Sequence, residues 1–501
     1  MKKGLLALTA CVCAVWAYGK VEFATPFADG VVLQREARTA IWGKAAAGER
    51  VTVEFAGQKV STTAGADGKW LVRLAPMAAS KEGRTLRAND ATVGDVLVGE
   101  VWFCCGQSNT ELPLVGVDPH FSDREGRLLA ASTRLPYVRF AYASNYRWSV
   151  TPRERAAYPV VWKRFTPENL GEAPSFSAMG VYFAIALYNA MDIPVGIVGS
   201  YWGGTNIDAW TPREGYECAP ESLRPTMEYP VVTADKWNGA CKRGPIQGPQ
   251  QQPSVLWNEM VAPWCPMTMK GFIWYQGCHN GSEAHLYCDK MHALYKGWSK
   301  QFENPGLKLY FVQLAPWKFS WWGLNAAQAK FAAEEPNAGM VTSVDVGNSA
   351  DIHPVDKGPL GRRLAALALN RDYGFDRLVA DAPTVRSVRA EGDRLVLSFD
   401  HANGWYLYNF DWTLDVPFEL AGEDGVYRPA KLVNANKGQT QPKEWVTNGR
   451  VDGKDLVLQA EGVAAPRRVR YLFNAPWTGH LYADSGLPLG PFEASVGVAR
   501  D

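Results

Sequence analysis

The stretch Val101-Trp102-Phe103-Cys104-Cys105-Gly106-Gln107-Ser108-Asn109 joins an apolar run to a polar turn. The apolar run is typical of a buried strand, and Gly106 with the polar residues after it indicates a sharp turn. A serine at the carboxyl end of such a strand is where α/β hydrolases expose a nucleophile, because the turn presents the hydroxyl and leaves backbone N–H groups free. The alternative interpretation is an ordinary polar turn in which Ser108 caps a helix.

Apolar strands alternate with helical segments on both sides of this stretch, from about residue 93 to residue 372. The further strands are expected at 137–140, 195–198, 272–275, 309–312 and 340–343, and the helices at 179–191, 284–301, 324–334 and 357–369. This alternation predicts a mostly parallel sheet with helices on both faces. Such a sheet carries its functional residues at the carboxyl ends of its strands.

Short runs of alternating apolar and polar residues occupy both ends of the chain and predict antiparallel β structure there. We therefore expect three domains after a leader of residues 1–19. They are an N-terminal β domain (20–92), a central α/β domain (93–372) and a C-terminal β domain (373–501).

The first 19 residues have the pattern of an export signal. Two lysines precede the apolar run 4–17, and small residues stand at Ala17 and Gly19. The run is shorter than the roughly 20 residues that span a bilayer, so the sequence predicts a secreted or periplasmic protein without a membrane span. Leu8-Thr9-Ala10-Cys11 also fits a bacterial lipoprotein box, which is the less favoured alternative.

The composition excludes some partners and favours others. In 501 residues, 52 Lys and Arg balance 51 Asp and Glu, which leaves no excess positive charge for binding nucleic acid. A hydrophobic fraction of 47% argues against a disordered chain. The 20 Trp, 20 Tyr and 20 Phe residues favour a carbohydrate partner weakly, because flat aromatic side chains stack on sugar rings.

The nine cysteines show no metal-binding spacing. Neither a CxxC pair nor an HExxH motif occurs, so the sequence predicts no structural zinc site and no zinc-dependent hydrolysis. Cys218 and Cys241 are candidates for a disulfide in an oxidising compartment, although the sequence alone fixes no pairing.

A second candidate block, Asp351-Ile352-His353-Pro354, follows the last predicted strand. A serine nucleophile needs a base, and the base needs a carboxylate that holds its tautomer. His353 and Asp351 supply both groups, and Asp345 is an alternative carboxylate. The other interpretation is an aspartate that caps the next helix beside an exposed histidine.

Two more turns follow predicted strands and offer hydrogen-bond donors. Trp202-Gly203-Gly204-Thr205 provides backbone N–H groups, and Gln276-Gly277-Cys278-His279-Asn280 provides a side-chain amide. Such donors stabilise an oxyanion and contribute about 10²–10³ in rate each. Taken alone, the first block is better explained as an ordinary tight turn, and Asn280 as a loop cap.

These four blocks, in this order, resemble the sialate O-acetylesterase family, a carbohydrate-esterase branch of the SGNH hydrolases. The likeness covers nearly the whole chain after the leader. The other segments that carry it are Phe27–Arg35, Val96–Trp102, Ala209–Thr211, Gln313–Pro316 and Tyr482–Pro488.

The resemblance implies a fold and a site. The fold is a central three-layer α/β/α SGNH domain flanked by β-sandwich-like regions. Ser108 would be the nucleophile, His353 the base and Asp351 the residue that orients it. The implied oxyanion donors are Ser108, Gly203, Gly204 and Asn280, and the candidate substrate contacts are Gln107, Asn109, Trp202, Gln276 and Trp317.

The implied activity is a serine esterase that removes O-acetyl groups from a carbohydrate through an acetyl-Ser intermediate, without metal or organic cofactor. O-acetylated sialic acid is the favoured substrate. The alternatives are deacetylation of xylan or another plant polysaccharide, and a carbohydrate-binding protein with a degenerate site. Trp317 could stack on a sugar, or it could belong to a hydrophobic lid or a domain contact.

The sequence departs from the family pattern at one block. Cys278 and His279 stand where the family usually has Glu and a small polar residue. This leaves open whether Asp351 alone orients His353 and which substrate is preferred. A Cys278–His279 dyad is disfavoured, because adjacent side chains on an extended segment point in opposite directions.

Overall fold

The computed structural model describes residues 20–143, 146–170, 176–217, 219–347, 350–408, 416–437, 448–474 and 481–497. The predicted signal peptide, residues 1–19, lies outside these residues, and so does Cys218 of the candidate disulfide. Within the described ranges, no helix is both long and apolar enough to cross a membrane.

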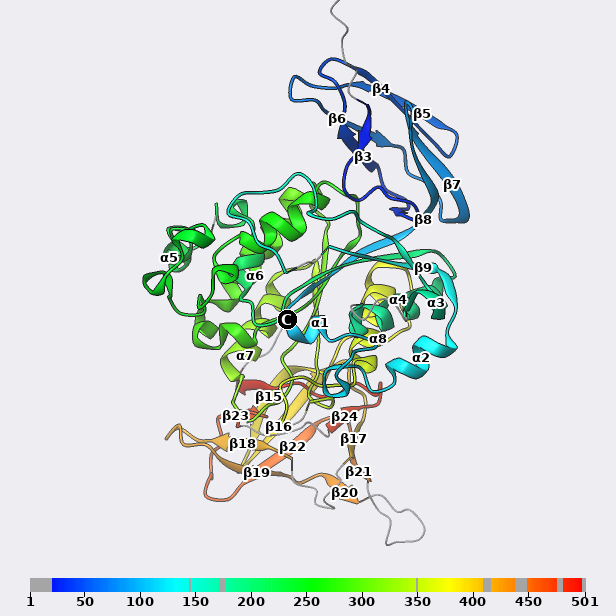
Figure 1. Cartoon of the computed structure of the whole chain (residues 1–501). Coiled ribbons are helices and arrows are strands. Elements are labelled where there is room, and N and C mark those ends of the chain that lie inside the picture. The colour runs from blue at the N-terminus through cyan, green and yellow to red at the C-terminus, as the bar shows by residue number, and fades with distance from the viewer. Residues whose placement is uncertain are drawn as a thin grey trace, which may run out of the picture.

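A parallel sheet runs through the middle of the molecule, in the strand order β10-β9-β11-β8-β12-β13-β14 (Figure 1). The strands are β8 (Ala91–Gly106), β9 (Leu135–Tyr142), β10 (Lys163–Phe165), β11 (Val195–Tyr201), β12 (Gly271–Tyr275), β13 (Lys308–Val312) and β14 (Ala338–Val341). Only β10 pairs antiparallel along this order. The predicted parallel sheet is therefore confirmed. The chain order reverses at β8, and the carboxyl end of a strand at such a reversal is where open α/β sheets place their sites.

Helices pack on both faces of this sheet. Trp102 and Phe103 are neighbours on β8 and point to opposite faces. The Trp102 ring lies 5.1 Å from Phe183, and the Phe103 ring lies 5.9 Å from Trp298, each on a different helix. The long helices are α4 (Ala178–Met191), α6 (Tyr287–Gln301), α7 (Trp322–Glu334) and α8 (Gly358–Asp372), and the short ones are α1 (Ser108–Glu111), α2 (Gly126–Ser132), α3 (Pro167–Leu170) and α5 (Arg224–Met227).

Four of the N-terminal strands are continuous with the central sheet, whereas the first, third and sixth form a separate three-stranded sheet. The first half of β8 pairs with N-terminal strands and its second half with β11 and β12. The N-terminal strands are β1 (Glu22–Phe23), β2 (Val32–Gln34), β3 (Thr39–Lys44), β4 (Arg50–Phe55), β5 (Gln58–Thr63), β6 (Lys69–Leu74) and β7 (Ser80–Ala88). The boundary predicted after residue 92 falls inside this one strand, and a single hydrophobic core extends from Val21 to Ala380.

The C-terminal region has a hydrophobic core of its own, from Val388 to Leu489. Seven strands form one sheet and four form another, at the opposite end of the molecule from β1–β7 (Figure 1). They are β15 (Thr384–Glu391), β16 (Arg394–Asp400), β17 (Trp405–Tyr408), β18 (Phe418–Ala421), β19 (Arg428–Leu432), β20 (Ala435–Lys437), β21 (Asn448–Val451), β22 (Leu456–Ala460), β23 (Arg468–Tyr471), β24 (Leu481–Ala483) and β25 (Phe492–Ser495). β structure thus returns where the sequence pattern predicted it.

Candidate active site

The turn at the end of β8 depends on a glycine. Gly106 has a φ of 144°, and a Cβ atom there would lie 2.3 Å from the Tyr275 carbonyl oxygen. A side chain would therefore push apart the ends of β8 and β12. With glycine in place, the chain turns directly into α1, whose first residue is Ser108, and the Ser108 side chain stays partly exposed.

Ser108, His353 and Asp351 meet at this strand end. His353 Nε2 lies 2.9 Å from Ser108 Oγ, and His353 Nδ1 lies 3.4 Å from Asp351 Oδ1. The same Asp351 oxygen accepts a hydrogen bond of 2.8 Å from the His353 backbone N–H. Burial, partly by the edge-on ring of Phe121, lowers the pKa of His353, while the Asp351 charge opposes this shift. The lowered pKa favours the neutral imidazole, whose Nε2 faces the Ser108 hydroxyl.

The alternative carboxylate, that of Asp345, is paired with an arginine and not with His353. Asp345 accepts two hydrogen bonds from Arg363, at 2.8 and 2.6 Å. Such a bidentate pair fixes the carboxylate. Of the two aspartates that the sequence left open, Asp351 is the one against His353.

A buried lysine joins the histidine loop to the serine turn. Lys357 Nζ donates to Asn109 Oδ1 at 2.6 Å, and Asn109 Nδ2 donates to the Ile352 carbonyl at 3.0 Å. Burial lowers the pKa of Lys357 to about 7. Asn109 is 2% exposed and links the serine turn to the histidine loop, and its predicted contact with substrate stays a prediction. The role of Lys357 was not predicted from the sequence.

The other predicted amides lie in a buried network around the end of β12. Gln107 Oε1 accepts from the Gly277 N–H at 3.1 Å. Gln276 Nε2 donates to Asn280 Oδ1 at 2.8 Å, and Tyr287 donates to Gln276 Oε1 at 2.7 Å.

Asn280 is fully buried in this network. Its Oδ1 also accepts from the Ile207 N–H at 3.0 Å, and its Nδ2 donates to Glu283 at 3.3 Å. These bonds use both ends of the amide, so the role of Asn280 as an oxyanion donor stays a prediction.

The glycine turn after β11 packs directly on the serine. A Cβ atom on Gly203 would lie 3.3 Å from Ser108 Cβ, which explains the small residue. The Gly203 N–H donates to Glu111 Oε2 at 2.6 Å, whereas the Ser108 N–H donates to no acceptor among the described residues. Gly204 has a φ of 67°, and its carbonyl accepts from Gln251 at 2.6 Å.

A cavity of about 240 Å³ adjoins this turn. Glu111, one helical turn beyond Ser108, lines it, and its carboxylate accepts a hydrogen bond from Tyr146. The Tyr146 ring lies 5.4 Å from Trp202 and edge-on to it. Phe121, which contacts the His353 ring, lines the same cavity. Neither Glu111 nor Tyr146 was predicted from the sequence, although the position of Glu111 three residues after the serine was a usable signal.

The comparison with known proteins decides the family. A family model described as "Carbohydrate esterase, sialic acid-specific acetylesterase" matches residues 98–370. The chain belongs to this family. The resemblance seen in the sequence is therefore confirmed, and the protein is a carboxylic ester hydrolase of a family that deacetylates sugars.

Individual relatives agree with this assignment. The esterase is 28% identical to rat sialate O-acetylesterase over 436 residues, which cover 75% of this chain and 79% of the relative. It is 28% identical to the human sialate O-acetylesterase over 406 residues, covering 72% and 73% of the two chains. The crystal structure of XAC1771, a carbohydrate acetylesterase from Xanthomonas citri, superposes with a TM-score of 0.78 at 30% identity, over 95% of this chain and 100% of that one.

The Cys278–His279 block of the esterase does not form a dyad. Burial raises the pKa of the Cys278 thiol to about 12, which keeps it protonated. His279 Nε2 lies 2.8 Å from both the Pro245 carbonyl and Gln251 Nε2, so these groups and not the thiol are its hydrogen-bond partners.

The tryptophans after β13 lie against the C-terminal region of the esterase. Trp317 stacks on Trp321 with ring centres 5.5 Å apart, and the Trp322 ring lies 4.7 Å from Phe473. These contacts suit the alternative of a domain contact, and stacking of Trp317 on a sugar stays a prediction.

Proposed function

We propose that the esterase removes O-acetyl groups from O-acetylated sialic acid through an acetyl-Ser intermediate. Ser108 is the nucleophile, His353 the base and Asp351 the group that orients it. The observation that carries the proposal is the row from Ser108 Oγ through both imidazole nitrogens to Asp351, with a hydrogen bond of 2.9 Å to Nε2 and a separation of 3.4 Å between Nδ1 and the carboxylate.

The chemistry follows from this row. His353 takes the Ser108 proton as Oγ attacks the acetyl carbon, and it then returns that proton to the sugar oxygen as the ester bond breaks. Water activated by the same imidazole releases acetate from the acetyl-Ser intermediate. The Ser108 N–H, which has no acceptor among the described residues, is the first proposed oxyanion donor. Gly203, Gly204 and Asn280 are candidates for the second, and the Gly203 N–H must leave Glu111 to serve.

The substrate is proposed to enter beside Glu111 and Trp202. Trp202 is a predicted sugar contact that remains partly exposed, next to the cavity of Tyr146 and Phe121. The buried Gln107, Asn109 and Gln276 would then support the site without touching the sugar.

The finer assignments of fold and compartment are also proposals. Strand order and helices on both faces of the sheet support a three-layer SGNH domain at 93–372. β regions at 20–92 and 373–501 would flank it. The pattern of residues 1–19 supports export to the periplasm or the exterior.

Acetate release from O-acetylated sialoglycans and from acetylated xylan tests the proposal. Ser108→Ala is expected to lower kcat by at least about 10³-fold, because no other group replaces the nucleophile. Ser132→Ala, at an exposed serine that ends α2, is the matched control and should behave as wild type. Faster release from xylan would replace the sialic acid assignment. A protein that binds sugar but neither releases acetate nor is labelled at Ser108 by an organophosphonate would be a carbohydrate-binding protein instead.

A further inference from the structure

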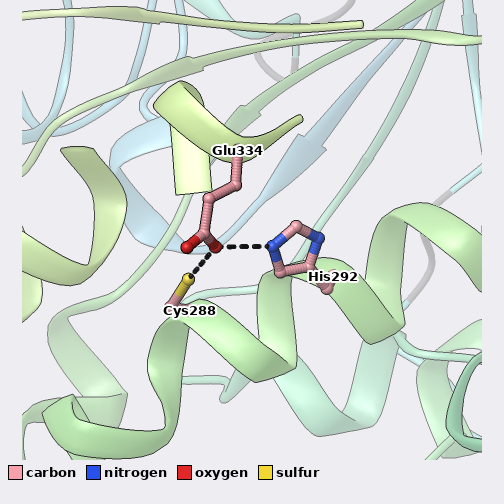
Figure 2. A group of neighbouring side chains, drawn as sticks. All are labelled: Cys288, His292 and Glu334. Atoms are coloured by element: carbon pink, nitrogen blue, oxygen red, sulfur yellow. Dashed lines mark hydrogen bonds and ion pairs between the residues drawn. The ribbon is translucent and has the colours of Figure 1, made fainter. Parts of the chain in front are cut away.

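Three side chains with metal-binding atoms converge between α6 and α7. Figure 2 shows Cys288 and His292 projecting from α6 toward Glu334, the last residue of α7. Glu334 Oε2 lies 3.1 Å from His292 Nε2 and 3.4 Å from Cys288 Sγ, and all three candidate atoms lie within 4.8 Å of one another. The hydrogen bonds, ion pair and ring contact of these three residues do not involve Ser108 or His353.

These separations suit a tetrahedral zinc ion. Bonds of about 2.0 Å to nitrogen and oxygen and about 2.3 Å to sulfur place neighbouring ligand atoms roughly 3.3–3.6 Å apart. The 3.1 and 3.4 Å separations are close to this range, and the third pair, Cys288 and His292, lies within 4.8 Å, so a bound metal would draw these two side chains together. A four-residue spacing on a helix also sets Cys288 and His292 on one face.

The surroundings leave the group accessible and its ligand atoms available. The Cys288 residue is 6% exposed, whereas the His292 and Glu334 side chains are 23% and 45% exposed, so an ion can enter from solvent. The Phe331 ring packs edge-on against His292 with centres 4.8 Å apart and restricts the imidazole. Lys330 lies 3.8 Å from the other Glu334 oxygen, Oε1, and leaves Oε2 to the cluster.

We propose that Cys288, His292 and Glu334 bind a zinc ion that joins α6 to α7. Thiolate, imidazole and carboxylate are the three ligand types that zinc takes in proteins, and a solvent molecule would complete the tetrahedron. On binding, a Zn–S bond forms and the thiol proton, now donated to Glu334, is released to solvent; no electron is transferred. α6 follows the Cys278–Asn280 block and α7 follows the Trp317–Trp321 loop, so the ion would fix two segments that come after site strands.

Cobalt substitution tests this proposal on the full chain after removal of metal. Titration with Co²⁺ should give a thiolate-to-cobalt charge-transfer band and intense visible bands of tetrahedral cobalt, saturating at about one ion per chain. Cys288→Ser should abolish the charge-transfer band. Cys265→Ser, at a partly buried cysteine outside the group, is the control and should keep it. If the band is absent in wild type, or persists in Cys288→Ser, the three side chains are hydrogen-bonded to one another but do not bind a metal.

If Cys288→Ser does not fold, a second measurement tests the zinc site. Zn²⁺ should raise the Tm of the wild type, because a ligand that binds only the folded state stabilises it. Glu334→Gln, at a half-exposed helix end, should bind Co²⁺ at least about tenfold more weakly and lose the rise in Tm. An equal rise in Tm in wild type and Glu334→Gln would overturn the assignment.

Discussion

The turns that end β8 and β12 are built alike and used differently. Each follows a strand of the same parallel pair, and each contains a glutamine, a glycine at positive φ and an asparagine. The β8 turn leaves Ser108 partly exposed, with its hydroxyl against His353. The β12 turn buries Asn280 completely and uses its amide in internal hydrogen bonds.

The difference lies in what covers each turn. The β8 turn opens toward the cavity beside Glu111, while Tyr287 and the Ile207 backbone close over the β12 turn. A buried amide without partners costs free energy, so Asn280 is held by its bonds. Substitutions facing the first turn should therefore lower activity, and those within the second should lower stability.

Asp351→Asn gives the largest expected effect in this comparison. An asparagine cannot stabilise the imidazolium and favours the wrong tautomer, so kcat should fall by roughly 10³-fold or more. Steady-state acetate release measures this fall. Asp345→Asn is the control: it weakens the pair with Arg363 and should lower Tm with little change in kcat. Similar losses of kcat in both variants would mean that Asp351 has no special role.

Asn280→Ala tests the second turn. Loss of the amide leaves the Ile207 N–H and Gln276 Nε2 short of an acceptor, which should cost about 1–3 kcal/mol in the free energy of unfolding. Denaturant unfolding measures this cost, and kcat per folded molecule should change only a few-fold. A fall of kcat by about 10²-fold or more would instead make Asn280 an oxyanion donor.

The sequence predicts the strands and helices well, because apolar runs such as 195–198 and 272–275 are strong local signals. It does not show that β8, Ala91–Gly106, pairs with N-terminal strands along its first half and with β11 and β12 along its second, since a local pattern does not specify partner strands. Ser108, Asp351 and His353 could be expected to meet, because the carboxyl ends of parallel strands share one edge.

The supporting contacts could not be predicted in the same way. Asn109 and Lys357 are 248 residues apart, and Glu334 is 42 residues from His292. Tertiary packing selects such partners, so residue type and spacing alone do not reveal them. The sequence therefore predicted no metal, whereas the folded chain brings three ligand types together.

Lys357→Met should shift the pH dependence of the β8 site. Burial lowers the pKa of His353, so kcat/KM should rise with pH and level off above that lowered pKa. Below pH 7, Lys357, whose pKa is about 7, is mostly charged. Its charge lowers the pKa of His353, whereas the charge of Asp351 raises it. Removing the cation raises the pKa of His353, so the acidic limb should move to higher pH, by up to about one unit.

A pH profile of kcat/KM from pH 4 to pH 9 measures this shift, since roughly two units on each side of the expected pKa are needed. Loss of the donor to Asn109 will also lower stability, but the position of the limb does not depend on the amount of folded enzyme. A limb that stays in place or moves to lower pH would contradict the assigned coupling.

Cys278→Ser should have the smallest effect, although it alters the block that departs from the family pattern. The thiol has a pKa of about 12 and is neutral at pH 7, so a neutral hydroxyl leaves the charge around Lys357 unchanged. We expect kcat/KM within about threefold of wild type, since only a buried polar contact changes. A loss of about 10³-fold, measured as acetate release, would instead place the nucleophile on Cys278. That outcome would exchange the roles of the two turns, because the β12 turn would then carry the chemistry and Ser108 would only support it.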